Sequence, residues 1–302
     1  MASKSKPVAL LEYAALRAVC GVVNAVPHPL ALALARGAAV VAFSVFRFKR
    51  ARTMRRISKV FPGIEPRRAA QIARESLANI LQNAVDMIRA SRFDRKWIER
   101  HVDNVGVYAA RLKELVDEGR GVVIMVPHMG NWYMAAWAMA ACGMPLSAIA
   151  ARQRNPHVDA WMKRLYGSID VVERGSARVL REVLERLANG RAFAILPDLR
   201  VPTHDVEVPF LNGTANVSHG GAAFAIAAKC PIVVAAMRRR KGRHFFDHIA
   251  TLRPDPNAKD RKEEARRLTR EAMSLIDKAI QKTPGQWFWF NKRWILERVH
   301  TD

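Results

Sequence analysis

The first 60 residues combine apolar stretches with basic residues. Positions in 8–25 and 30–48 are mostly apolar, and prolines at 27 and 29 lie between the two stretches. Charged residues and prolines interrupt this region, whereas a membrane-spanning helix needs about 20 consecutive apolar residues. We therefore predict a helix or helical hairpin that lies in the membrane interface, with a buried helix pair and a single membrane span as the alternatives.

A basic cluster directly follows the second apolar stretch. Cations at the border of an apolar helix are placed to meet anionic lipid headgroups on the cytoplasmic face of a membrane. A basic helix then ends at residues 61–63. The cluster consists of Arg47, Lys49, Arg50, Arg52, Arg55 and Arg56.

Helical spacing continues to residue 118, and then the pattern changes. Apolar positions recur every three or four residues in 66–91 and 108–118. From residue 121 on, short apolar runs alternate with longer helical patterns, which is typical of buried parallel strands joined by helices. The predicted strands are 121–126, 146–150, 169–172, 192–196, 232–236 and 244–252. The predicted helices among them are 132–142, 155–166, 175–189, 218–228 and 257–282.

This alternation predicts an α/β fold with a mostly parallel central sheet flanked by helices, preceded by an N-terminal membrane-associated helical segment. We place the boundary between residues 1–60 and the α/β domain of residues 61–302. Ligands of such sheets bind beyond the carboxyl ends of the strands. A base, three cations and a carboxylate follow predicted strands there and indicate a catalytic site: His128, Arg152, Arg154, Asp198 and Arg200.

His128 is the candidate for the central chemical role, because it follows a buried strand and precedes a helix. An imidazole titrates near neutral pH and can take a proton from an attacking hydroxyl. Backbone amides near Gly130 could stabilise a developing oxyanion, since glycine permits close approach. The alternative is that His128 only makes a structural hydrogen bond.

The charge of the chain points to an anionic partner. Fifty Lys and Arg against 27 Asp and Glu give a net charge of +23. Nucleic acid, an anionic membrane surface and an acidic carrier protein all remain open on this ground. Near the C-terminus, aromatic and basic residues alternate in a pattern that fits a membrane anchor or single-stranded nucleic acid, and we favour the membrane. This cluster comprises Trp287, Trp289, Lys292, Arg293, Trp294 and Arg298.

Cysteine usage gives no sign of a metal centre. Cys20, Cys142 and Cys230 are far apart and lie among apolar residues. Isolated thiols of this kind are typical of buried free cysteines in a reducing compartment, and a zinc site needs a tighter group of ligands. We expect neither a metal nor a bound cofactor.

The stretch Val-Pro-His-Met-Gly-Asn-Trp at 126–132 resembles the H-x-G-N-W signature of the bacterial lipid A late acyltransferases. These are lysophospholipid-acyltransferase-like enzymes related to phosphatidylinositol mannoside acyltransferase. Further segments match family motifs in the same order, so the resemblance covers nearly the whole chain. They lie at residues 60–62, 152–159, 174–190, 196–213 and 286–294.

The resemblance implies an O-acyltransferase of lipid biosynthesis, similar to those that make lipid A, at the cytoplasmic face of the inner membrane. The donor would be an acyl carrier protein or acyl-CoA thioester, and the acceptor a hydroxyl of a lipid or glycolipid, with no nucleic acid involved. His128 and Asp198 are the predicted catalytic residues. The predicted substrate-binding residues are Gly130, Asn131, Tyr133, Arg152, Arg154 and Arg200.

The sequence departs from the family motif at one position. The motif places Asp or Glu five residues after the histidine, where this chain has Tyr133. That acid orients the imidazole, so another residue must take its role, and there are two candidates. Either Asp198 takes the role, or Tyr133 or Asn131 holds the ring by a neutral hydrogen bond. A member of the family that binds lipid or acyl carrier protein without catalysis is the alternative function.

Overall fold

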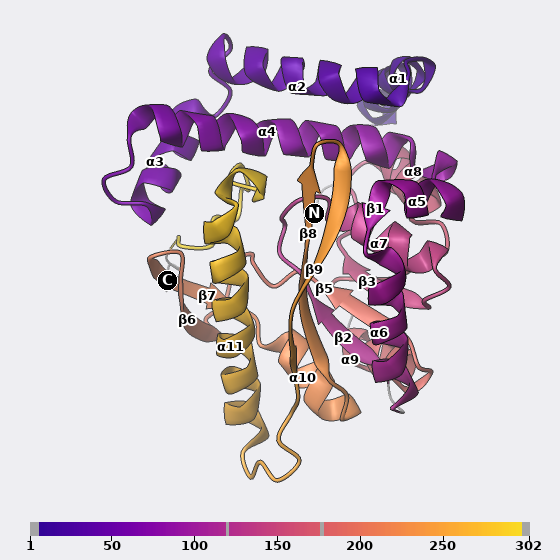
Figure 1. The fold of residues 1–302 in the computed structure, drawn as a ribbon, viewed down its shortest axis with the longest axis vertical. Coiled ribbons are helices and arrows are strands. Elements are labelled where there is room, and N and C mark those ends of the chain that lie inside the picture. Colours follow the sequence, from indigo (N-terminus) through magenta and orange to yellow (C-terminus); the bar gives the residue numbers. More distant parts are fainter. Residues whose placement is uncertain (1–5, 119–120, 176–177, 298–302) are drawn as a thin grey trace.

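A seven-stranded, mostly parallel sheet forms the centre of the molecule (Figure 1). The computed structural model describes residues 6–118, 121–175 and 178–297. The strands follow the order β1-β9-β8-β2-β5-β3-β4, and only β8 and β9 pair antiparallel among them. Their bounds are β1 Val102–Asp103, β2 Val122–Met125, β3 Leu146–Ala150, β4 Asp170–Glu173, β5 Ala192–Ile195, β8 Ile232–Arg240 and β9 Arg243–Leu252.

Helices cover both faces of the sheet because successive strand residues point to opposite sides. Val122 and Ile124 of β2 join one buried cluster with α6 and α7, whereas Val123 and Met125 join the other with α9, α10 and α11. The fold class predicted from the sequence is therefore confirmed. These helices are α6 Val105–Asp117, α7 Trp132–Ala141, α9 Val179–Ala188, α10 Gly220–Ala228 and α11 Arg261–Lys282; α5 Arg95–His101 and α8 Pro156–Tyr166 lie beside them.

Four helices form the first part of the described chain. They are α1 Lys6–Ala25, α2 His28–Ser44, α3 Arg50–Val60 and α4 Pro66–Ile88. α4 crosses over one end of the sheet, and α1 and α2 lie along its outer side (Figure 1). Among the described residues, α1 alone is long and apolar enough to cross a membrane. The large exposed hydrophobic side chains of the described chain concentrate between Val8 and Phe48, with Val107 and Leu180 as the exceptions.

Several parts of the sequence behave differently from the prediction, among them residues 95–103, which form α5 and β1. Residues 206–217 form an unpredicted hairpin of β6 Val206–Phe210 and β7 Gly213–Val217 outside the main sheet. Trp287, Trp289 and Trp294 are only 3%, 0% and 7% exposed, so the predicted C-terminal membrane anchor is wrong. These rings pack into the core and against one another, while Arg298 lies outside the described residues.

The basic cluster also lies only partly on the surface. Arg56 is buried, with its guanidinium 4.7 Å from the Trp294 ring centre and donating to the carbonyl oxygens of Trp289 and Asn291. Arg47, Arg50 and Arg55 are exposed. Arg56 therefore fixes the C-terminal segment, and these three are the fully exposed cations of the cluster.

Candidate active site

The register of two neighbouring strands brings His128 and Asp198 together. β2 and β5 are parallel, and Met125 lies opposite Ile195. His128 and Asp198 each come three residues later, so both side chains reach the same point beyond the sheet. His128 Nδ1 lies 2.7 Å from Asp198 Oδ1. The backbone N–H of His128 donates to Asp198 Oδ2, also at 2.7 Å.

A third donor completes the surroundings of this carboxylate. The indole Nε1–H of Trp287 donates to Asp198 Oδ2 at 2.7 Å. Burial raises the pKa of Asp198, which is 1% exposed, but the charge of His128 and the three hydrogen bonds outweigh it and hold the pKa below its ordinary value. Asp198 is thus an anion at neutral pH. Because an anionic carboxylate only accepts hydrogen bonds, Nδ1 of His128 carries the proton and Nε2 is the basic nitrogen.

A cavity of about 740 Å³ opens beside His128. Its walls are mainly apolar and come from α6, α7 and the sheet. Three arginines and no Asp or Glu of the described chain line it: Arg174, Arg200 and Arg293. The cavity therefore suits a molecule with a long apolar part and an anionic part. Apolar lining residues include Leu112, Ile124, Met139, Leu146, Val233 and Phe246.

The aromatic wall next to His128 includes the residue that replaces the motif acid. The Trp132 ring meets the imidazole edge-on, with ring centres 5.1 Å apart. Tyr133 lines the same cavity and stacks on Trp137. Burial raises the pKa of Tyr133, so its phenol stays neutral at neutral pH. Asp198, on the neighbouring strand end, is the carboxylate that contacts the imidazole.

Gly130 and Asn131 lie behind the His128 loop, and neither lines the cavity. The Gly130 N–H donates to the carbonyl oxygen of Gln286 at 3.0 Å, so the amide expected to serve an oxyanion is already engaged. Asn131 is fully buried and caps α7, with its Oδ1 accepting from the N–H of Met134 at 2.9 Å. Asparagine is a preferred residue at this helix position.

The three predicted arginines lie in different places. Arg200 lines the large cavity, and its Nη2 is 3.7 Å from Glu297 Oε2. Arg152 lines a separate pocket of about 310 Å³, and Arg154 is exposed on the loop before α8. The structure thus brings Arg200 to His128's cavity, whereas it leaves Arg152 and Arg154 outside its lining.

Sequence reasoning missed Arg174, Arg293 and Trp287 as site residues. Arg174 directly follows β4. Ligands bind beyond the carboxyl ends of parallel strands, and this rule, which indicated His128, would have indicated Arg174 as well. Trp287 and Arg293 come from the aromatic segment that was interpreted as a membrane anchor. Their approach depends on the chain returning to the sheet after α11, for which the sequence carries no local signal.

Comparison with known proteins places the chain in a family. Residues 1–295 match the family described as bacterial lipid A biosynthesis acyltransferase. The chain is also similar to a phosphatidylinositol mannoside acyltransferase of Mycolicibacterium smegmatis (strain ATCC 700084 / mc(2)155), with 24% identity over 234 residues that cover 75% of this chain and 73% of that protein. With the family match spanning nearly its whole length, the chain belongs to the bacterial lipid A biosynthesis acyltransferases.

Proposed function

We propose that the protein transfers a fatty acyl chain from an acyl thioester to a hydroxyl of a membrane lipid or glycolipid, with His128 as general base and Asp198 as its partner. The observation that carries this proposal is the His128–Asp198 pair at the wall of an apolar cavity. A buried carboxylate on Nδ1 fixes the tautomer in which Nε2 accepts a proton, and it stabilises the imidazolium that forms.

The reaction follows from this arrangement. Nε2 removes the proton of the acceptor hydroxyl while that oxygen attacks the carbonyl carbon of the thioester. The tetrahedral intermediate carries a negative charge on the former carbonyl oxygen. It collapses by breaking the C–S bond, and the imidazolium returns the proton to the leaving thiolate. We assign the stabilisation of negative charge to the arginines of the cavity, since the Gly130 amide is engaged.

Asp198 supplies the carboxylate that the motif normally provides at position 133. The two Asp198 oxygens accept three hydrogen bonds, and this supports the proposal that Asp198 acts as an anion in the reaction. Tyr133→Glu would add a second carboxylate to an apolar wall, and we expect it to lower turnover. A large gain in turnover would instead support a non-catalytic role for the natural protein.

The N-terminal helices would hold the protein at the membrane that contains the lipid acceptor. Exposed apolar side chains on α1 and α2, including Leu11 and Leu34, are free to enter the interface of a membrane. Arg47, Arg50 and Arg55 follow directly and would meet anionic headgroups. We therefore propose attachment to the cytoplasmic face of the inner membrane. An acyl carrier protein or acyl-CoA would then deliver the chain from the aqueous side.

The test is acyl transfer by the purified protein bound to anionic vesicles that contain a bacterial lipid extract. Labelled acyl carrier protein and labelled acyl-CoA are offered separately, and the lipid products are identified by mass spectrometry. We expect a labelled lipid or glycolipid product from one donor and none from the His128→Ala variant. Absence of transfer by the wild type from both donors, or equal transfer by His128→Ala, would refute the proposal.

A further inference from the structure

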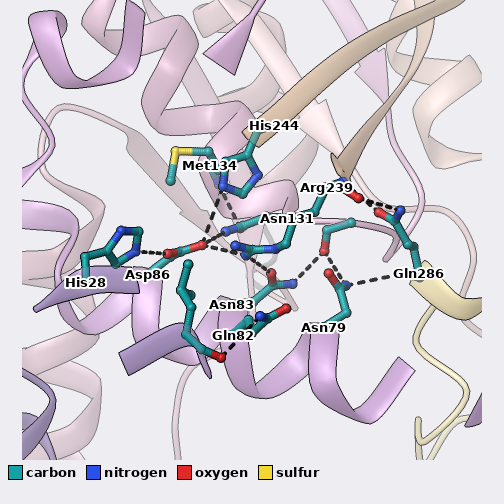
Figure 2. Close-up of polar contacts among 12 residues, drawn as sticks. His28, Asn79, Gln82, Asn83, Asp86, Asn131, Met134, Arg239, His244 and Gln286 are labelled. Atoms are coloured by element: carbon teal, nitrogen blue, oxygen red, sulfur yellow. Dashed lines mark hydrogen bonds and ion pairs between the residues drawn. The ribbon is translucent and has the colours of Figure 1, made fainter. Parts of the chain in front are cut away.

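A buried polar network joins α4 to Asn131 and Arg239 (Figure 2). Asn131 is three residues from His128 in the chain. The centre of the network is Asp86 of α4, which is 0% exposed. Asp86 Oδ2 accepts from Asn131 Nδ2 at 2.8 Å and from Arg239 Nη2 at 2.6 Å. Asp86 Oδ1 lies 2.8 Å from His28 Nε2. Three distant parts of the chain therefore meet on one carboxylate.

Asn131 transmits this contact to the active-site loop. One end of its amide caps α7 through the N–H of Met134, and the other end donates to Asp86. These two hydrogen bonds hold the Asn131 side chain in one conformation. In that conformation Asn131 caps α7 and fixes its first turn. The first residue of α7 is Trp132, whose ring touches the edge of the His128 imidazole.

The remaining bonds hold the same loop from two sides. Asn79 and Asn83 of α4 donate to the Gly130 carbonyl oxygen at 2.8 and 2.6 Å. The N–H of Phe288 donates to the His128 carbonyl oxygen at 3.0 Å. α4 thus braces the back of the loop, and the segment that contains Trp287 braces its front.

Asp86 of α4 is the negative charge of the network, and Arg239 is its positive partner. Burial raises the pKa of Asp86, but Arg239, the bond from His28 and His244 lower it to about 2. Burial and Arg239 lower the pKa of His244 to about 3, so that ring is neutral. One carboxylate therefore faces one guanidinium, and His28 supplies a further hydrogen bond from α2.

We infer that Asp86 is a positioning residue for His128, and that His28 of α2 takes part in this positioning, so that the seating of the N-terminal helices and the geometry of the active-site loop are linked. The catalytic part of this inference rests on the proposed acyl transfer. The link itself is a property of the fold, since α2 reaches Asp86 only when it lies along α4.

Two substitutions at His28 test the inference with matched packing. The His28 ring packs against Phe93 and Trp97, with ring centres 5.8 and 5.6 Å away. His28→Phe keeps a ring there and removes the hydrogen bond to Asp86, whereas the amide of His28→Gln can replace it. We expect His28→Phe to lower kcat about tenfold with an unchanged KM for the thioester, because a small displacement of a reacting group is costly. His28→Gln should restore most of kcat.

A substitution at the other end of the network provides an independent check. Asn131→Ser retains a preferred helix-capping oxygen but loses the donor to Asp86. We expect a similar fall in kcat. The double variant His28→Phe/Asn131→Ser should fall by less than the product of the two single effects, because both act through Asp86.

Hydrogen exchange of peptides covering residues 127–134 gives a readout that needs no substrate. Exchange should be faster in His28→Phe than in wild type and His28→Gln. Wild-type kcat and exchange in His28→Phe, or an equal loss of kcat in both His28 variants, would overturn the inference. If the wild type transfers no acyl group, the proposed function fails, and the exchange comparison alone then decides whether His28 orders the loop.

Discussion

Gly130→Ala is expected to disable the site without touching any atom of the proposed catalytic pair, His128 and Asp198. Gly130 has φ +57°, a conformation that disfavours residues with a Cβ. An ideal Cβ at this position would lie 1.6 Å from the backbone oxygen of Met237 on β8. Carbon and oxygen atoms do not approach closer than about 3 Å without bonding, so the loop must retreat from β8 by roughly 1.4 Å.

The magnitude follows from two separate costs. The left-handed backbone conformation costs an alanine about 1–2 kcal/mol. Crowding against a rigid strand adds about 1–3 kcal/mol, giving a loss of about 2–5 kcal/mol in the free energy of unfolding. Because His128 lies two residues away, a displacement of this size is expected to lower kcat about 100-fold.

Gly143 provides the matched control. It has φ +82°, but a Cβ there would meet no atom within 4 Å. Gly143→Ala should therefore cost only the conformational part, about 1–2 kcal/mol, and leave kcat unchanged. Urea unfolding and steady-state acyl transfer measure both variants. Equal losses of stability in the two variants, or wild-type kcat in Gly130→Ala, would show that close packing of the loop on β8 does not position His128.

Further predictions concern the two buried carboxylates and the buried His244. Asp198→Asn keeps the shape of the side chain but removes its charge, and steady-state assays should show kcat reduced by about 10²–10⁴-fold; wild-type activity would exclude Asp198 from catalysis. Trp287→Phe removes one of three hydrogen bonds to Asp198 and should lower kcat only about tenfold in the same assay. Asp86→Ala leaves Arg239 as a buried unpaired charge and should cost about 3–5 kcal/mol in urea unfolding, with a loss below 1 kcal/mol arguing against the network. The pKa of His244 is about 3 in the folded protein and near 6.5 in the unfolded chain, so unfolding takes up a proton at pH values between these two. The free energy of unfolding should therefore fall by about 2 kcal/mol from pH 6.5 to pH 5. Urea unfolding of His244→Phe should show a flatter dependence on pH.

The strand pattern predicted the central part of the site. The apolar runs that end before His128 and Asp198 marked β2 and β5, and the parallel pairing of these strands makes the two side chains neighbours. Sequence reasoning reached this pair because it depends on local pattern and on one general rule about parallel sheets. Sequence reasoning also predicted α1 and α2 as two separate apolar helices.

The sequence could not show which way the residues of the loop face. Gly130 and Asn131 adjoin His128 in the chain, yet they point toward α4 and β8 rather than toward the cavity. Trp287 is about 90 residues from Asp198 and reaches it only through the return of the chain after α11. The alternation of aromatic and basic residues in this segment predicts neither the return of the chain to the sheet nor the burial of the tryptophan rings. Long-range packing decides such contacts, and local periodicity does not encode it.

Asp198 accepts hydrogen bonds from segments of the chain that are synthesised at different times. The loop after β2 and the end of β5 emerge first, and the segment with Trp287 follows only after the whole of α11. A growing chain that has completed its sheet therefore still lacks one donor to the carboxylate and the brace on the His128 carbonyl. The surroundings of Asp198 are therefore completed late in synthesis, long after the apolar helices α1 and α2 have been made.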